Sequence, residues 1–195
     1  MSETSELEKP PVYTIRPWLE SDLVDVAHVM QAGYGKTYIG EQPGITAEDI
    51  AEHSADWDSP EQIAEHLDIF RERQQNPRVI SLMAEDNGRA VGFCRARFFE
   101  DNEVHIAGAD ATVEMLYVHP DYFGKGVAAE LFEAVLEKLG SSTWIELEVV
   151  AHNNRAKNFY RKYGFEVLNP DGFDTEFTLI GGKVIPEQYM VRKAK

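Results

Sequence analysis

Residues 114–132 read EMLYVHPDYFGKGVAAELF, and this stretch decides the fold. An apolar strand ends at Pro120, because proline cannot continue the hydrogen bonding of a strand. A turn with two glycines follows, and then a helix whose apolar side chains recur every four residues: Val127, Leu131, Val135 and Leu139. The N–H groups at the start of a helix attract anions, and glycine lets a ligand approach the backbone closely. The stretch therefore predicts a strand, a phosphate-binding turn and a helix.

The spacing within the turn distinguishes three kinds of phosphate site. A P-loop needs a lysine and then serine or threonine after its second glycine, and here Val127 follows Gly126. The dinucleotide fingerprint G-x-G-x-x-A fits residues 124–129, with Glu146 and Glu148 about 20 residues further on. However, five residues separate the strand from the turn, and about 55 residues after the helix are too few for a doubly wound domain. In the third alternative the turn binds the pyrophosphate of a nucleotide that lies beside the end of the strand. The second alternative, a dinucleotide-dependent oxidoreductase, stays open as a rival function.

The rest of the chain shows further strand and helix signals. Strands are expected at 12–18, on both sides of the hairpin turn Asn87-Gly88, and at 112–120, 143–150, 165–168 and 183–193. Besides the helix after the glycine turn, helices are expected from Ser21 or Asp22, at 46–53, from Ser59 and at 154–163. Residues 1–10 read as a disordered tail and residues 11–195 as one domain. The order of elements predicts an α/β domain with one central sheet.

The composition disfavours several classes of function. The chain of 195 residues has a formal net charge of −15, which argues against nucleic acid as a partner and is compatible with a cationic amine. Its single cysteine, Cys94, lies in a strand-like run, so we expect a core residue and neither a disulfide nor a metal site. The N-terminus shows no signal segment, and no run approaches about 20 apolar residues. A cytoplasmic protein that does not bind membranes is expected.

Two segments resemble the GNAT superfamily of acetyl-CoA-dependent N-acetyltransferases. The family's loop, Q/R-x-x-G-x-G/A, aligns with residues 123–128, where Gly126 and Ala128 match and Phe123 replaces the usual Gln or Arg. The segment LEVVAHNNRAKNFYRKYGFEVL, residues 147–168, matches V-x-x-x-N-x-x-A-x-x-x-Y-x-x-x-G-F at Val149, Asn153, Ala156, Tyr160, Gly164 and Phe165. Two linked motifs in this order are far more specific than a lone pair of glycines. The resemblance covers nearly the whole chain and is weak between residues 34 and 78.

The resemblance implies a GNAT-like single domain with a mixed, mostly antiparallel sheet of six to seven strands and about four helices. Two parallel strands, 112–118 and 144–150, would splay apart and hold acetyl-CoA as co-substrate. The backbone of the first strand would bond the pantetheine arm like an added strand. For Asn153, capping of the following helix is an alternative role. The residues expected to contact the cofactor are Leu116, Tyr117, Val118, Phe123, Gly124, Lys125, Gly126, Val127, Ala128, Asn153, Ala156 and Tyr160.

The resemblance further implies N-acetylation of a primary amine by direct attack in a ternary complex. The departing CoA thiolate needs a proton, which Tyr160 would donate; the alternative is an aromatic residue of the core. The amine must be neutral to attack, so its proton must go to a base or to a water chain that leads to one. Glu114 is the candidate base, and its alternative is a partly buried carboxylate held by Arg or Lys.

Tyr34 and Tyr38 lie where the family builds its substrate pocket, so they are expected to line it. The expected partner is a small-molecule amine, and a homodimer is possible. The identity of the amine stays open. A non-catalytic acyl-CoA-binding sensor on the same fold is the alternative function.

Overall fold

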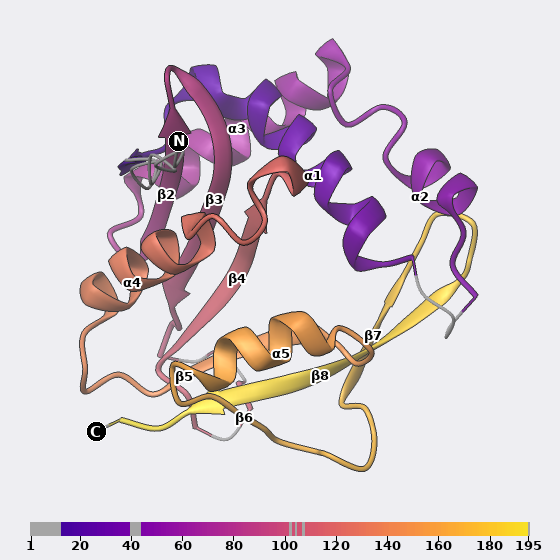
Figure 1. Cartoon of the computed structure of the whole chain (residues 1–195). Coiled ribbons are helices and arrows are strands. Elements are labelled where there is room, and N and C mark those ends of the chain that lie inside the picture. Colours follow the sequence, from indigo (N-terminus) through magenta and orange to yellow (C-terminus); the bar gives the residue numbers. More distant parts are fainter. Residues whose placement is uncertain (1–12, 40–43, 102, 104, 107, 195) are drawn as a thin grey trace, which may run out of the picture.

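One eight-stranded sheet organises the protein, whose computed structural model describes residues 13–39, 44–101, 103, 105–106 and 108–194. The strand order is β1-β2-β3-β4-β5-β8-β6, with β7 paired to β8 (Figure 1). The predicted tail, residues 1–10, lies outside the described residues. The strands are β1 Thr14–Pro17, β2 Val79–Asp86, β3 Arg89–Phe98, β4 Ala111–Val118, β5 Ile145–Val150, β6 Glu166–Val167, β7 Thr175–Thr178 and β8 Val184–Arg192.

Strand direction separates this sheet from a dinucleotide-binding fold. β4 and β5 form the only parallel pair in the described sheet, and every other paired neighbour is antiparallel. A doubly wound dinucleotide fold has a mostly parallel sheet. The dinucleotide alternative is therefore wrong, and the expected mixed, mostly antiparallel sheet is confirmed.

Helices cover both faces of the sheet. Helix α1 (Leu23–Thr37) contacts β3 and β4, α3 (Pro60–Gln75) contacts β2, and α2 (Ala47–His53) packs on α1. Helix α4 (Val127–Leu139) covers the other face of β2–β4, and α5 (Asn154–Arg161) lies beside β6 (Figure 1). Neighbouring residues of β3 show the alternation, since Phe93 packs with Trp18 below α1 while Cys94 packs with Leu131 of α4.

Local sequence signals set the helix ends. Thr46 and Ser59 cap α2 and α3, each accepting a hydrogen bond from the N–H three residues later. Gly140 follows α4 with φ +86°, a left-handed conformation that glycine adopts without strain. These boundaries agree with the prediction from the sequence.

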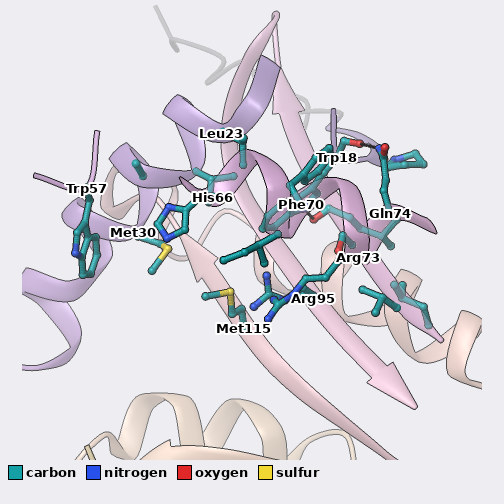
Figure 2. A pocket seen from close by; sticks show the side chains of 18 of the residues that line it. Trp18, Leu23, Met30, Trp57, His66, Phe70, Arg73, Gln74, Arg95 and Met115 are labelled. Carbon is teal, nitrogen blue, oxygen red and sulfur yellow. Dashed lines mark hydrogen bonds between the residues drawn. The ribbon is translucent and has the colours of Figure 1, made fainter. Parts of the chain in front are cut away.

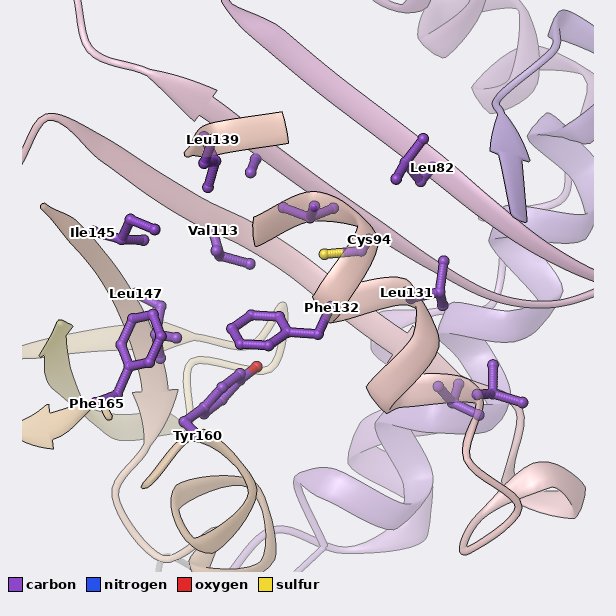
Figure 3. Close-up of a cluster of buried hydrophobic side chains, with 14 of the residues drawn as sticks. Leu82, Cys94, Val113, Leu131, Phe132, Leu139, Ile145, Leu147, Tyr160 and Phe165 are labelled. Carbon is purple, nitrogen blue, oxygen red and sulfur yellow. The ribbon is translucent and has the colours of Figure 1, made fainter. Parts of the chain in front are cut away.

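The largest core lies between α4, α5 and the sheet (Figure 3). Phe132 of α4 is fully buried and packs in a tilted arrangement against Tyr160 and Phe165, at centroid distances of 5.4 and 5.8 Å. Cys94 is also fully buried in this cluster, and burial raises the pKa of its thiol. It is the core residue that the sequence predicts.

The C-terminal part departs from the prediction. The sequence predicts a turn rich in Gly and Asp between the last two strands, 165–168 and 183–193, but within it Thr175–Thr178 pairs with β8 as a hairpin. The hairpin closes at Gly182, with φ +79°, and Leu179 N–H donates to the Lys183 carbonyl at 2.9 Å. A four-residue strand of alternating exposure carries too weak a pattern to be recognised among Asp and Gly.

Gly92 of β3 offers a test of how tightly β3, β4 and α4 pack. A Cβ at this position would lie 2.9 Å from the Tyr117 carbonyl oxygen and 3.1 Å from side-chain carbons of Val118 and Val127. We expect Gly92→Ala to lower the free energy of unfolding by about 1–3 kcal/mol, measured by urea titration. Gly35→Ala, in α1 with nothing within 4 Å, is the control and should be neutral or stabilising. Equal effects of the two changes would contradict this packing.

Candidate active site

The parallel strands β4 and β5 separate soon after they pair. Only Ala111–Val113 pair with Ile145–Leu147, while β4 continues to Val118 and β5 to Val150. β3 pairs with the other edge of β4, and β8 with the other edge of β5. The facing edges, residues 114–118 and 148–150, therefore have no strand partner within the described sheet. The upper end of β4 lies apart from β8 and α5 in Figure 1.

The glycine turn lies at the end of this open edge. A short 3₁₀ turn, Pro120–Tyr122, leads into Gly124 and Gly126, with φ of +77° and +93°. Phe123 N–H donates to the Pro120 carbonyl and Lys125 N–H to the Tyr122 carbonyl, so these two groups serve the turn itself.

Four other N–H groups, in the turn and at the start of α4, are available to a ligand. Those of Gly124, Gly126, Val127 and Ala128 meet no acceptor within the described part of the chain. A Cβ built on Gly124 would have nothing within 4 Å. Free N–H groups at a helix N-terminus, with open space before them, fit the pyrophosphate that the sequence predicts.

Phe123, where the expected polar side chain is missing, lies below an arginine. The guanidinium carbon of Arg155, from the first turn of α5, lies 3.9 Å from the centre of the Phe123 ring. This is a close cation–π contact. The second motif thus provides a cation, Arg155, beside the turn. The sequence pattern alone does not indicate this contact.

Tyr160 extends from α5 into the core that α4 covers. The residue is 8% exposed, its ring contacts Phe132, and it points toward Cys94 of β3 (Figure 3). Burial raises the pKa of the phenol well above its ordinary value, so the hydroxyl stays protonated at neutral pH. It can act as a proton or hydrogen-bond donor.

Asn153 caps α5, since its Oδ1 accepts the Ala156 N–H at 3.0 Å. The capping role that was left open as an alternative is therefore present. The cap uses the side-chain oxygen and leaves the amide nitrogen as the group that can contact a ligand. Ala156 packs at the edge of the core around Tyr160.

Glu114 is held by arginines. Its Oε2 accepts Arg95 Nε at 2.7 Å, its Oε1 accepts Arg97 Nε at 2.8 Å, and Arg73 lies 3.8 Å away. Burial opposes ionisation of Glu114, but the three arginines outweigh it and hold its pKa below the ordinary value. The geometry is that of the ion-paired carboxylate left open as an alternative, which disfavours Glu114 as a base at neutral pH.

Tyr34 and Tyr38 lie in an aromatic cluster between α1 and β4. Both are buried, the Tyr34 ring stacks 5.7 Å from Tyr117, and the Tyr38 and Tyr117 hydroxyls lie 3.3 Å apart. The edge of the Trp57 ring packs on Tyr34 at 4.7 Å. The two predicted substrate residues thus adjoin the open part of β4 through Tyr117, as part of a packed wall.

Glu187 on β8 was not recognised from the sequence. It pairs with Val150, at the wide end of the opening, and shares a face of the sheet with Ile185, which packs on the aromatic cluster. Burial, with help from the like charge of Glu148, raises the pKa of Glu187 to about 7. Its carboxylate is therefore poised to exchange protons at neutral pH.

A cavity of about 620 Å³ lies between α1, α3 and the sheet (Figure 2). Apolar side chains form most of its wall, and a few polar groups complete it. The labelled lining residues in the figure are Trp18, Leu23, Met30, Trp57, His66, Phe70, Arg73, Gln74, Arg95 and Met115. Met115 belongs to the open part of β4, so the cavity extends to this strand on the face that α1 contacts.

Neither a metal site nor a membrane-spanning helix is found among the described residues. No group of three or more His, Cys, Asp or Glu side chains is placed there to hold a metal ion. Among the described helices, none has the length and apolarity needed to cross a bilayer.

Comparisons with known proteins agree on one family. Residues 45–165 match the family described as acetyltransferase (GNAT). An uncharacterized N-acetyltransferase of Mycobacterium tuberculosis is 35% identical over 121 residues, which cover 56% of this chain and 70% of that protein.

Solved structures share the fold. The PaiA N-acetyltransferase of Thermoplasma acidophilum, in complex with coenzyme A, superposes with a TM-score of 0.66 at 22% identity, over 93% of this chain and 99% of that one. YncA of Salmonella typhimurium, a putative acetyltransferase with acetyl-CoA, gives 0.61 at 18% identity, over 94% and 95% of the two chains.

Glu146 of β5 makes stability depend on pH. It is 6% exposed, its Oε2 has no hydrogen-bond partner among the described residues, and burial raises its pKa to about 7. In the unfolded chain Glu146 has the ordinary glutamate pKa of about 4.3, whereas in the folded protein its pKa is about 7. Between these values the unfolded chain loses its proton first, so the contribution of Glu146 to stability should fall as the pH rises from about 4.3 through about 7. Glu146→Gln should therefore raise the melting temperature more at pH 8 than at pH 5. Exposed Glu176→Gln is the control, and a gain at pH 5 equal to that at pH 8 would contradict the assignment.

Proposed function

The chain belongs to the acetyltransferase (GNAT) family and is an acetyl-CoA-dependent acyltransferase, and we propose that it acetylates a primary amine by direct attack in a ternary complex. The observation that carries the proposal is the three-residue pairing of β4 and β5, which leaves an open strand edge beside a turn of free N–H groups. A strand edge and an anion site in line suit a ligand with an amide-bearing arm and a pyrophosphate.

The cofactor would be held mainly by the backbone. Along β4 the open edge at Leu116, Tyr117 and Val118 would bond the pantetheine arm, and the Asn153 amide would bond it from α5. At the turn, the free N–H groups of Gly124, Gly126, Val127 and Ala128 would bind the pyrophosphate.

Phe123 and Lys125 have a different role from these four residues. Their N–H groups are used within the turn, so their contribution would come from their side chains. We infer that Arg155, stacked on Phe123, supplies the positive charge that the family's Gln or Arg position would otherwise offer.

Bound acetyl-CoA would supply an acetyl group activated as a thioester. The Tyr160 hydroxyl, protonated and buried near the separation of β4 and β5, would donate its proton to the leaving sulfur. On the opposite face of the sheet, Glu187 at the wide end of the opening would accept the proton of the amine. Glu114 remains the rival base from the sequence, although its arginine partners stabilise the ionised form.

Tyr160→Phe tests the acid. Turnover, measured as release of free coenzyme A across an amine panel, should fall about 10²–10⁴-fold, while acetyl-CoA affinity by calorimetry should change little. Tyr163→Phe is the matched control, because its hydroxyl donates to Glu133 on the surface, and it should retain activity.

Two outcomes would count against the proposal. Full turnover in Tyr160→Phe removes the acid role alone. Absence of acetyl-CoA binding at millimolar concentration would contradict the proposed function, whereas binding without coenzyme A release for any amine would favour the sensor.

The pH profile tests the base. A base with a pKa of about 7 acts only when deprotonated, so kcat/KM should rise with pH through about 7 and level off above it. Glu187→Gln should lower the plateau and remove this rise. If Glu114→Gln removes it instead and Glu187→Gln keeps it, Glu114 is the base.

A further inference from the structure

The cavity below α1 and α3 has the size and lining of a small-molecule site. Its volume of about 620 Å³ lies within the range of ligand pockets, about 300–1,000 Å³. Trp18, Trp57 and Phe70 provide aromatic walls, and Met30 and Met115 add adaptable apolar surface (Figure 2). Such a lining suits an apolar ligand body.

Arginine is the unusual component of this apolar wall. The Arg95 side chain is 16% exposed, and Figure 2 shows it near Met115, with Arg73 also lining the cavity. Arg95 donates to Glu114 through Nε, and its terminal nitrogens meet no acceptor among the described residues. The guanidinium stays charged, and donors that are partly screened from water bind an anionic acceptor strongly. The geometry therefore favours an anionic partner in the cavity.

The charged groups around the cavity favour an anionic group on the partner. Arg73, Arg95 and Lys138 line the cavity, and no Asp or Glu is among its described lining residues. Glu114, which pairs with Arg73 and Arg95, offsets one of these three positive charges, so a carboxylate on the partner meets an excess of positive charge. The site is cationic although the whole chain has a net charge of −15.

The cavity also extends to β4, the strand whose edge is open. Arg95 pairs with Met115 across β3 and β4, and neighbouring strands lie about 4.8 Å apart. Trp57, at the other end of the cavity, contacts Tyr34, which stacks on Tyr117 of the open edge. A ligand between these points can place one end at Arg95 and the other beside β4.

We propose that this cavity is the acceptor site and that the acceptor bears, besides its amine, a carboxylate held by Arg95 and Arg73 across an apolar spacer. The inference rests on the proposed acetyl transfer and names its substrate class. The overall acidity of the chain favours a plain cationic amine, so the local geometry points to a different class from the composition.

A matched pair of acceptors tests the carboxylate. The probes are 4-(aminomethyl)benzoate and its uncharged analogue 4-(aminomethyl)benzamide, each titrated against intrinsic tryptophan fluorescence, because Trp18 and Trp57 line the cavity. The full chain should bind the benzoate about tenfold or more tightly than the benzamide, since hydrogen bonds to charged groups are strong. With acetyl-CoA present, coenzyme A release should show the same preference in kcat/KM.

Two arginine variants and one control localise the effect. Arg95→Gln and the more exposed Arg73→Gln should each reduce the preference toward equality, and Arg95→Lys should restore part of it. Arg71→Gln is the matched control, because Arg71 lies on α3 but pairs with Glu20 on the surface. Thermal melting of each variant confirms that it is folded.

Each outcome has one meaning. No binding of the benzoate, equal binding of both probes, or a preference that persists in both Arg95→Gln and Arg73→Gln overturns the proposal. Preferential binding without coenzyme A release for any amine contradicts the proposed acetyl transfer instead, so the two failures are distinguishable.

Discussion

The short pairing of β4 and β5 is the constraint on which the rest of the site depends. A sheet ordinarily satisfies its backbone groups by pairing, yet here the two strands pair only at Ala111–Val113 and Ile145–Leu147. β3 and β8 hold the outer edges, and α4 and α5 pack over one face, so the strands remain ordered although their inner edges are free. This separation leaves an open strand edge that leads to the glycine turn, and Tyr160 packs in the core beside it.

Local charge, and not the total, determines what each part of this opening can bind. The chain is strongly acidic, but Arg155 lies beside the glycine turn and Arg73 and Arg95 line the cavity. Glu187 is half-buried on β8, and burial together with the charge of Glu148 lets it keep its proton to about pH 7. Solvent and salt screen distant charges, so the nearby charges outweigh the net charge of the chain.

The sequence predicts what depends on neighbouring residues and misses what depends on distant ones. The turn at Gly124 and Gly126 follows from local spacing, as do the capped starts of α2, α3 and α5, and two linked motifs were enough to predict the family and the mixed sheet. An ion-paired Glu114 is one of the two alternatives that the sequence offers, but its three arginine partners could not be named, because β3, β4 and α3 meet only after folding. The burial of Glu187 depends in the same way on packing far along the chain, and so does the contact of Arg155 with Phe123.

The thiol of Cys94 can report how often the core around it unfolds locally. The thiol is fully buried beneath Tyr160 and α4, and its raised pKa keeps it protonated and unreactive. It is the single cysteine of the chain, so alkylation at one site follows the rate at which this core exposes itself to solvent. A ligand held between β4 and β5 stabilises the closed state and slows that alkylation, which makes occupancy of the cleft readable as a labelling half-life without any acceptor present.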